Sequence, residues 1–83
     1  MEIKFSRHAK RRAKLYRIPE SIITNILENS DLSQGENEII RNIEGFKYPL
    51  KIVVDVESDM IAVITNYPLK KRRQKWKFIM IKK

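Results

Sequence analysis

Two runs of β-branched residues, separated by three polar ones, place the strongest constraint on the fold of this chain. The runs are Lys51–Val56 and Met60–Tyr67, and Glu57-Ser58-Asp59 lies between them. Runs of this length and composition predict strands, and so short a connection joins them as an antiparallel hairpin. Both runs are apolar at consecutive positions, which is typical of strands covered on both faces. The hairpin is therefore predicted to form the centre of a sheet.

The segments before the hairpin predict two helices. Ser6 is a suitable N-cap for a helix that runs to about Tyr16. Pro19 and Glu20 suit the first turn of a second helix, which is expected to end near Asn29. The first of these helices is strongly basic and has a narrow apolar face, whereas the second carries an isoleucine-rich face.

Three further segments predict strands, over residues 2–5, 38–43 and 78–81. Helices that come first and strands that follow favour an α+β fold over an alternating α/β one. We expect two N-terminal helices packed on a twisted, mainly antiparallel sheet of three to five strands, in a single domain over residues 1–83.

Composition excludes several classes of function. The chain has no cysteine and one histidine, so a thiol nucleophile and a cysteine- or histidine-based metal site are excluded, and no cofactor is expected. With two glycines there is no phosphate-cradling loop. Asp55, Glu57 and Asp59 are interpreted as a solvated hairpin. No run resembles a signal peptide or a membrane span, so we expect a cytoplasmic protein without a membrane partner.

The formal net charge of +8 is concentrated at the two ends of the chain. Lys4–Arg17 holds seven basic residues and no acidic one, and Lys70–Lys83 holds eight basic residues and no acidic one. Between them, Glu20–Asp59 holds nine acidic and three basic residues. A fold that brings the two basic blocks to one face would attract a polyanion, and nucleic acid is the usual one.

Three stretches together resemble the RelE/ParE-like superfamily of small toxins, and within it a group of small uncharacterised proteins. They are a His-Ala-x-x-Arg pattern within Phe5–Arg12, the Tyr16–Pro19 approach to the second helix, and the hydrophobic strand Ile61–Pro68 with its Thr-x-Tyr ending. Pro19 and the absence of a glycine before the second helix depart from that pattern. The resemblance covers roughly residues 3–72.

The resemblance implies the toxin fold and, for many members, metal-independent RNA cleavage on or near the ribosome. It also implies a separate neutralising protein, so the expected partners are RNA, which is ribosome-associated in many members, and an acidic antitoxin-like protein. Other members of the superfamily poison DNA gyrase, and others have no known activity.

RNA cleavage without a metal needs an acid/base group and cations around the phosphate. His8 is the one side chain of a type that titrates near neutrality, and Arg12 follows one helical turn later with Arg11 beside it. Thr65 and Tyr67 share one strand face, which either lines the core or faces the cleft. The expected catalytic residues are His8, Arg12, Thr65 and Tyr67, and the expected nucleic-acid-binding residues are Arg7, Arg11, Lys70, Lys71, Arg72, Arg73 and Trp76.

Each of these features has a plainer interpretation. His8 can be a residue that packs or caps at the start of its helix, Thr65 and Tyr67 can be strand-end packing residues, and the 70–77 run can be a solvated surface. The alternatives to a ribonuclease are a non-catalytic RNA- or DNA-binding module and a protein-interaction domain.

Overall fold

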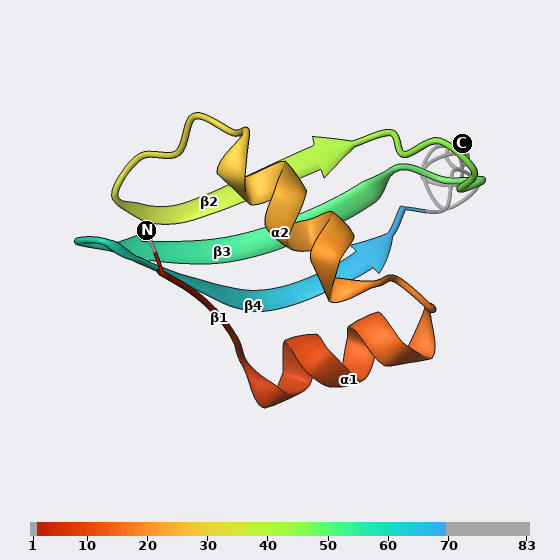
Figure 1. The fold of residues 1–83 in the computed structure, drawn as a ribbon, viewed down its shortest axis with the longest axis horizontal. Helices are drawn as coiled ribbons and strands as arrows, with labels where there is room; N and C mark the ends of the chain where they lie inside the picture. The colour runs from red at the N-terminus through yellow and green to blue at the C-terminus, as the bar shows by residue number, and fades with distance from the viewer. Residues whose placement is uncertain (1, 70–83) are drawn as a thin grey trace, which may run out of the picture.

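The computed structural model describes residues 2–69, and these form one sheet with two helices (Figure 1). The elements follow in the order β1 (Glu2–Phe5), α1 (Arg7–Leu15), α2 (Glu20–Glu28), β2 (Gly35–Arg41), β3 (Leu50–Glu57) and β4 (Met60–Pro68). The strand order in the sheet is β1-β4-β3-β2. The β1–β4 pair is parallel, and the β4–β3 and β3–β2 pairs are antiparallel.

The predicted hairpin is the centre of the sheet, because β3 and β4 are its two inner strands. A two-residue turn joins them, and Ser58 takes a φ of 55° there. Positive φ at such a turn matches the right-handed twist of the two strands. The carboxylates of Asp55, Glu57 and Asp59 are on exposed residues, as expected for a solvated hairpin.

A bulge interrupts the pairing of the two central strands. Val54 pairs with Val63 and Val53 pairs with Thr65, so Ile64 is an extra residue on β4. One inserted residue reverses which face the following side chains occupy. Before the bulge Val63 points into the core, whereas after it the inward residue is Asn66.

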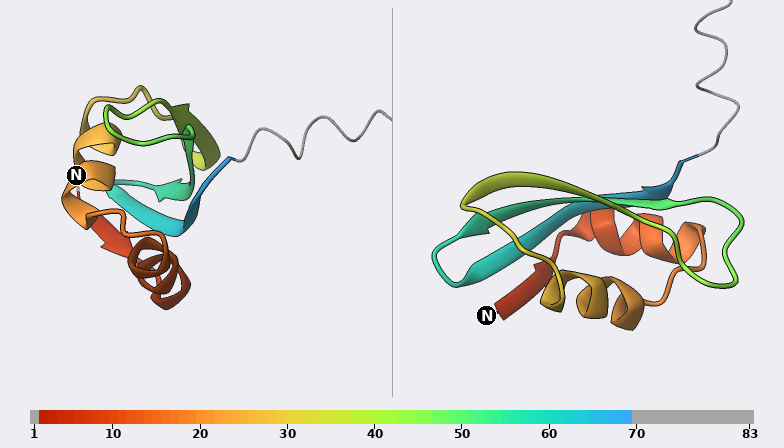
Figure 2. Two further views of the ribbon diagram at one scale, coloured as in Figure 1. Left: turned by 90° about the vertical axis from the view of Figure 1, so that its right-hand side faces the viewer. Right: turned by 90° about the horizontal axis from the view of Figure 1, so that it is seen from above.

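The two helices occupy different positions against the sheet. Figure 2 shows both on one side of it, and α1 runs along the outer edge of β4 (Figure 1). That edge is open because β1 pairs only with residues 60–63 of β4. Helix α1 buries Ala9 and Ala13, and these small side chains allow the helix to approach the strand closely.

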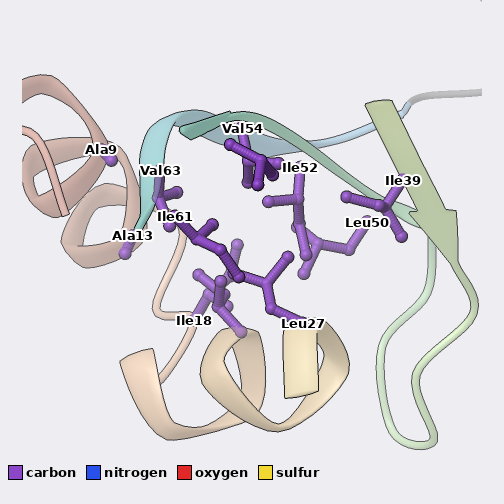
Figure 3. Packing of buried hydrophobic residues seen from close by; sticks show 12 residues of the cluster. Ala9, Ala13, Ile18, Leu27, Ile39, Leu50, Ile52, Val54, Ile61 and Val63 are labelled. Atoms are coloured by element: carbon purple, nitrogen blue, oxygen red, sulfur yellow. The ribbon is translucent and has the colours of Figure 1, made fainter. Parts of the chain in front are cut away.

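Helix α2 covers the sheet with Ile23 and Leu27, which point into the core with Ile18 of the preceding connection (Figure 3 labels Leu27 and Ile18). The sheet contributes the apolar side chains of its inner face, namely Ile39, Leu50, Ile52, Val54, Val56, Ile61 and Val63. Burying each large aliphatic side chain contributes about 1.5–3 kcal/mol.

The structure confirms an α+β fold with two N-terminal helices and a four-stranded sheet that is antiparallel except for one pair. Two boundaries differ from the sequence-based prediction. The strand predicted over residues 38–43 lies at Gly35–Arg41, and Pro19 is the N-cap residue of α2 rather than part of its first turn. The strand predicted over residues 78–81 lies outside the described residues.

Candidate nucleic-acid interface

Helix α1 presents a basic surface to solvent. Two alanines are its buried residues, so most of the helix circumference is exposed. The exposed residues of the helix and of the turn that follows it include Arg7, His8, Lys10, Arg11, Lys14 and Arg17, and we call these six the α1 basic surface. The helix contains no acidic residue to neutralise them.

The charge of residues 2–69 is strongly polarised. These residues carry ten basic and ten acidic side chains and hence no net charge, so the +8 of the whole chain comes from the eight basic residues after position 69. Seven of the ten basic residues fall within positions 4–17, and nine of the ten acidic ones within positions 20–59. A polyanion approaching this part of the molecule is attracted to α1 and repelled by the segments between positions 20 and 59 that carry the carboxylates.

Ser6 fixes the start of α1 on β4. Its hydroxyl accepts a hydrogen bond from the N–H of Ala9 (3.0 Å), which is the expected N-cap contact, and donates one to the carbonyl oxygen of Ile64 (3.0 Å). Its backbone N–H also donates to the carbonyl oxygen of Val63 (3.0 Å). The first turn of the helix is thereby held against the strand at the position of the bulge.

Asn66 supplies a second anchor from the strand side. It is fully buried, and its Nδ2 donates to the carbonyl oxygen of Ala9 (3.2 Å). Its Oδ1 is buried without a hydrogen-bond partner among the described residues. Since buried amide groups are normally hydrogen-bonded in full, the single bond of Asn66 indicates that this residue contributes by positioning the first turn of α1. His8 lies between Ser6 and Ala9, and Thr65 lies between Ile64 and Asn66, so the two anchors bring these two parts of the backbone together.

Thr65 and Tyr67 lie on the face of the sheet opposite the core, because each pairs with an outward residue of β3. Their partners are Val53 and Lys51. The Lys51 ammonium is 6.0 Å from the centre of the Tyr67 ring and 3.3 Å from Oε1 of Glu38. The Glu38 carboxylate first, and Tyr67 second, raise the pKa of Lys51 above its ordinary value, so this cation stays charged at neutral pH.

Arg12 is held in place by a side chain of its own helix. It is half-buried, and its Nη1 donates to the Tyr16 hydroxyl (3.4 Å). Tyr16 itself packs against the core. The Arg12 side chain therefore has less conformational freedom than those of the exposed Arg7 and Arg11. A restrained guanidinium suits a role in holding a phosphate in one position. Lys70, Lys71, Arg72, Arg73 and Trp76 lie outside the described residues.

A pocket of about 350 Å³ lies elsewhere, where the end of α2 meets the start of β1 and of β4. Its lining residues include the buried Leu27 and Ile61 and the acidic Glu28 and Asp31. Carboxylates repel phosphate, so this pocket does not belong to the candidate interface. Among residues 2–69 no three His, Asp or Glu side chains are grouped so that they could hold a metal ion, and no helix is long and apolar enough to cross a membrane.

No known protein family, curated protein or solved structure matches this chain.

Sequence reasoning missed three residues that shape the interface. The role of Asn66 could not be predicted, because its inward position depends on the bulge. A polar residue between Thr65 and Tyr67 carries no sequence signal of being buried. Lys51 and Glu38 were overlooked because their proximity to Tyr67 depends on strand register. The one available sign was Lys51 itself, a basic residue beside the apolar run Ile52–Val54. We call Lys51, Glu38 and Tyr67 the Lys51 cluster.

Proposed function

We propose that the protein acts on RNA and binds it through the α1 basic surface. The observation that carries this proposal is the separation of charge over residues 2–69, with the cations gathered on one exposed helix and the carboxylates on the rest. Arginine is well suited to phosphate because its planar guanidinium donates two parallel hydrogen bonds. Helix α1 is about 13 Å long, enough to follow two or three phosphates of a single strand.

Single-stranded RNA is preferred to duplex DNA as the ligand for two reasons. The likeness of the Phe5–Arg12 and Ile61–Pro68 stretches to the RelE/ParE-like toxins implies RNA for many members. In addition, Tyr67 lies half-buried on the sheet face opposite the core, where its ring can stack on an unpaired base. Such stacking contributes about 1–3 kcal/mol per base.

An NMR titration tests the location of binding. On adding a short single-stranded RNA, the amide signals of residues 7–14 should shift most, and those of the hairpin turn at Ser58-Asp59 should stay in place. Saturable binding that leaves the α1 signals unchanged would assign the interface to another surface. No binding at low salt would leave a protein-interaction domain as the better interpretation.

Metal-independent cleavage is a second candidate function, favoured by the position of His8. This residue is exposed, one helical turn from Arg12, and lies between two residues anchored to β4. The His8 imidazole would take the proton of a ribose 2′-hydroxyl as the 2′-oxygen attacks phosphorus. The bond between phosphorus and the 5′-oxygen would then break, and the 5′-oxygen would take a proton from solvent water, which reaches the exposed His8. The products are a 2′,3′-cyclic phosphate and a 5′-hydroxyl, and arginine stabilises the charge that develops on the phosphate oxygens.

The His8→Ala variant separates cleavage from binding. We expect cleavage to fall by about 10²–10⁴ while RNA affinity changes little, because proton transfer matters in the transition state alone. Lys10→Ala is the matched control, since Lys10 is exposed on the same helix and is expected to contribute binding only. Equal cleavage by wild type and His8→Ala would remove His8 from the chemistry, and a wild type that binds RNA without cleaving it would leave the binding function alone.

A further inference from the structure

Helix α1 is held to the sheet by less apolar packing than α2. Its buried residues are Ala9 and Ala13, whereas α2 buries Ile23 and Leu27. The stabilisation from burial grows with the apolar area removed from water, so two methyl groups contribute less than two large aliphatic side chains. Tyr16, which follows α1, adds a partly buried ring to the contact. The packing of α1 is therefore the weaker of the two.

The charges of α1 oppose its helical form. Arg7 and Arg11 are four residues apart, as are Lys10 and Lys14, and like charges at this spacing destabilise a helix. Arg7 also lies in the first turn, where the helix dipole favours an acidic residue and the helix has none. Lys14, in the last turn, is favourably placed and offsets part of this cost. None of these four cations forms an ion pair with any of residues 2–69, so their repulsion is not compensated there.

The connection after α1 contains a strained residue. The N–H of Ile18 donates to the carbonyl oxygen of Ala13 (2.8 Å), and the N–H of Arg17 donates to that of Lys14 (3.2 Å). This pair of bonds is the Schellman motif, in which the residue after the C-cap takes a left-handed backbone conformation. Glycine usually occupies that position because a Cβ atom is unfavourable there, whereas this chain has Arg17, with a φ of 57°. Opening the end of α1 releases this strain.

The hydrogen bonds that join α1 to β4 lie at its first turn, and one of the groups involved is unfavourably placed. Ser6 donates to the carbonyl oxygens of Val63 and Ile64, and Asn66 donates to that of Ala9. The Oδ1 atom of Asn66 is buried without a partner among residues 2–69, which is unfavourable for a polar atom. Water reaches this atom when α1 moves away from β4, so the docked helix alone carries the cost.

We infer that α1 opens from the sheet on its own, while the sheet and α2 stay folded, and that a phosphate chain bound to the α1 basic surface holds it closed. The opening exposes two alanines and the part of β4 that they cover. It relieves the repulsion among the cations, the strain at Arg17 and the unpaired oxygen of Asn66. A bound polyanion acts in the opposite direction, because it neutralises cations that the closed helix holds together. The opening concerns the free protein, whereas the closing by phosphate rests on the proposed function.

Amide hydrogen exchange on the unaltered full chain, followed by NMR, tests the opening without a ligand. After correction for the intrinsic rate of each residue, the amides of residues 11–15 should exchange at least about tenfold faster than those of residues 24–28 in α2. Both sets occupy the same positions of nine-residue helices, so helix length and fraying at the ends are matched. Equal protection of the two helices would overturn the inference.

Two substitutions at Arg17 test the physical cause of the opening. Arg17→Gly removes the Cβ atom and should slow the exchange of residues 11–15 by about two- to fivefold relative to Arg17→Ala. The alanine variant is the matched control, because it loses the same charge and keeps a Cβ atom. Identical exchange of residues 11–15 in the two variants would contradict the inference, since an opening that frees residue 17 has to respond to its strain.

RNA completes the test, with an outcome that is separable from the binding proposal. At a short single-stranded RNA concentration about a hundred times its dissociation constant, the exchange of residues 11–15 should slow by about a hundredfold, because α1 opens only after losing the ligand. RNA that shifts the α1 signals and leaves this exchange unchanged would refute the closing by phosphate. If no RNA binds, the proposed function and the closing both fail, whereas the exchange of the free protein and the Arg17 variants still decide whether α1 opens.

Discussion

Replacing Ser6 by alanine is expected to destabilise the protein measurably, although Ser6 lies on the surface. The substitution removes the N-cap hydrogen bond to Ala9, which is worth about 1 kcal/mol. It also removes the bond to the carbonyl oxygen of Ile64, worth about 0.5 kcal/mol at an exposed position where water replaces it. The expected loss in the free energy of unfolding is therefore about 1.5 kcal/mol, or about 6–12 °C in melting temperature for a domain of this size.

Urea denaturation followed by circular dichroism measures this loss, and the denaturant dependence of the unfolding free energy should stay the same. Two further substitutions divide the effect between the two bonds. Ser6→Asp accepts from Ala9 but donates nothing when ionised, so it should recover the capping part alone, whereas Ser6→Thr should recover both. If the free energy of unfolding of Ser6→Ala lies within about 0.3 kcal/mol of the wild-type value, Ser6 does not anchor α1 to β4.

The remaining predictions concern the core and the Lys51 cluster. Ile52→Ala should lower the free energy of unfolding by about 2–5 kcal/mol, because the side chain is fully buried. Ile64→Ala should lower it by less than about 1 kcal/mol, because Ile64 is 41% exposed. Urea denaturation measures both losses. Asn66→Asp should be about 3 kcal/mol less stable than wild type at pH 7, because the charged carboxylate is buried and cannot donate to the carbonyl oxygen of Ala9. Its stability should recover as the pH falls toward 4, where the protonated carboxyl can donate that bond. Thermal melts across this pH range measure the recovery. Glu38→Gln should lower the pKa of Lys51 toward its ordinary 10.5. Because that pKa is raised in the folded protein, the pair stabilises below pH 10.5 and the benefit is lost as the pH rises beyond it, so melting temperatures of wild type and Glu38→Gln should converge at high pH.

The helices and the central hairpin were predictable because their signals are local. The N-cap residue Ser6, the isoleucine-rich face of α2 and the short polar turn each determine structure through residues close to them in the sequence. Strand β2 was placed three residues too late at its start because its inward side is weakly apolar, with Asn37 and Ile39. Ile43 packs on the core from the connection after β2, so its apolar character suggested a strand that the backbone does not form there.

The candidate site was predictable in part. The basic character and the exposure of α1 follow from its composition, since two alanines give so narrow a buried face. The outward position of Thr65 and Tyr67 does not follow, because strict alternation from Ile61 and Val63 would have turned them into the core. The bulge at Ile64 reverses that alternation, and a bulge depends on how two strands pair rather than on either sequence alone.

The salt dependence of RNA binding tests the central claim, that α1 supplies phosphate contacts, most directly. For single-stranded RNA each phosphate contact contributes about 0.7 to the slope of log affinity against log salt concentration. Two or three contacts along α1, with a similar number from the basic run that begins at Lys70, would give a slope of about −3 to −4 in wild type. Removing Arg7 and Arg11 together, as Arg7→Gln/Arg11→Gln, should reduce the magnitude of the slope by about 1.4, whereas the matched Arg41→Gln/Lys47→Gln protein should keep the wild-type slope. An unchanged slope in the α1 variant, or a wild-type slope near zero, would contradict the account.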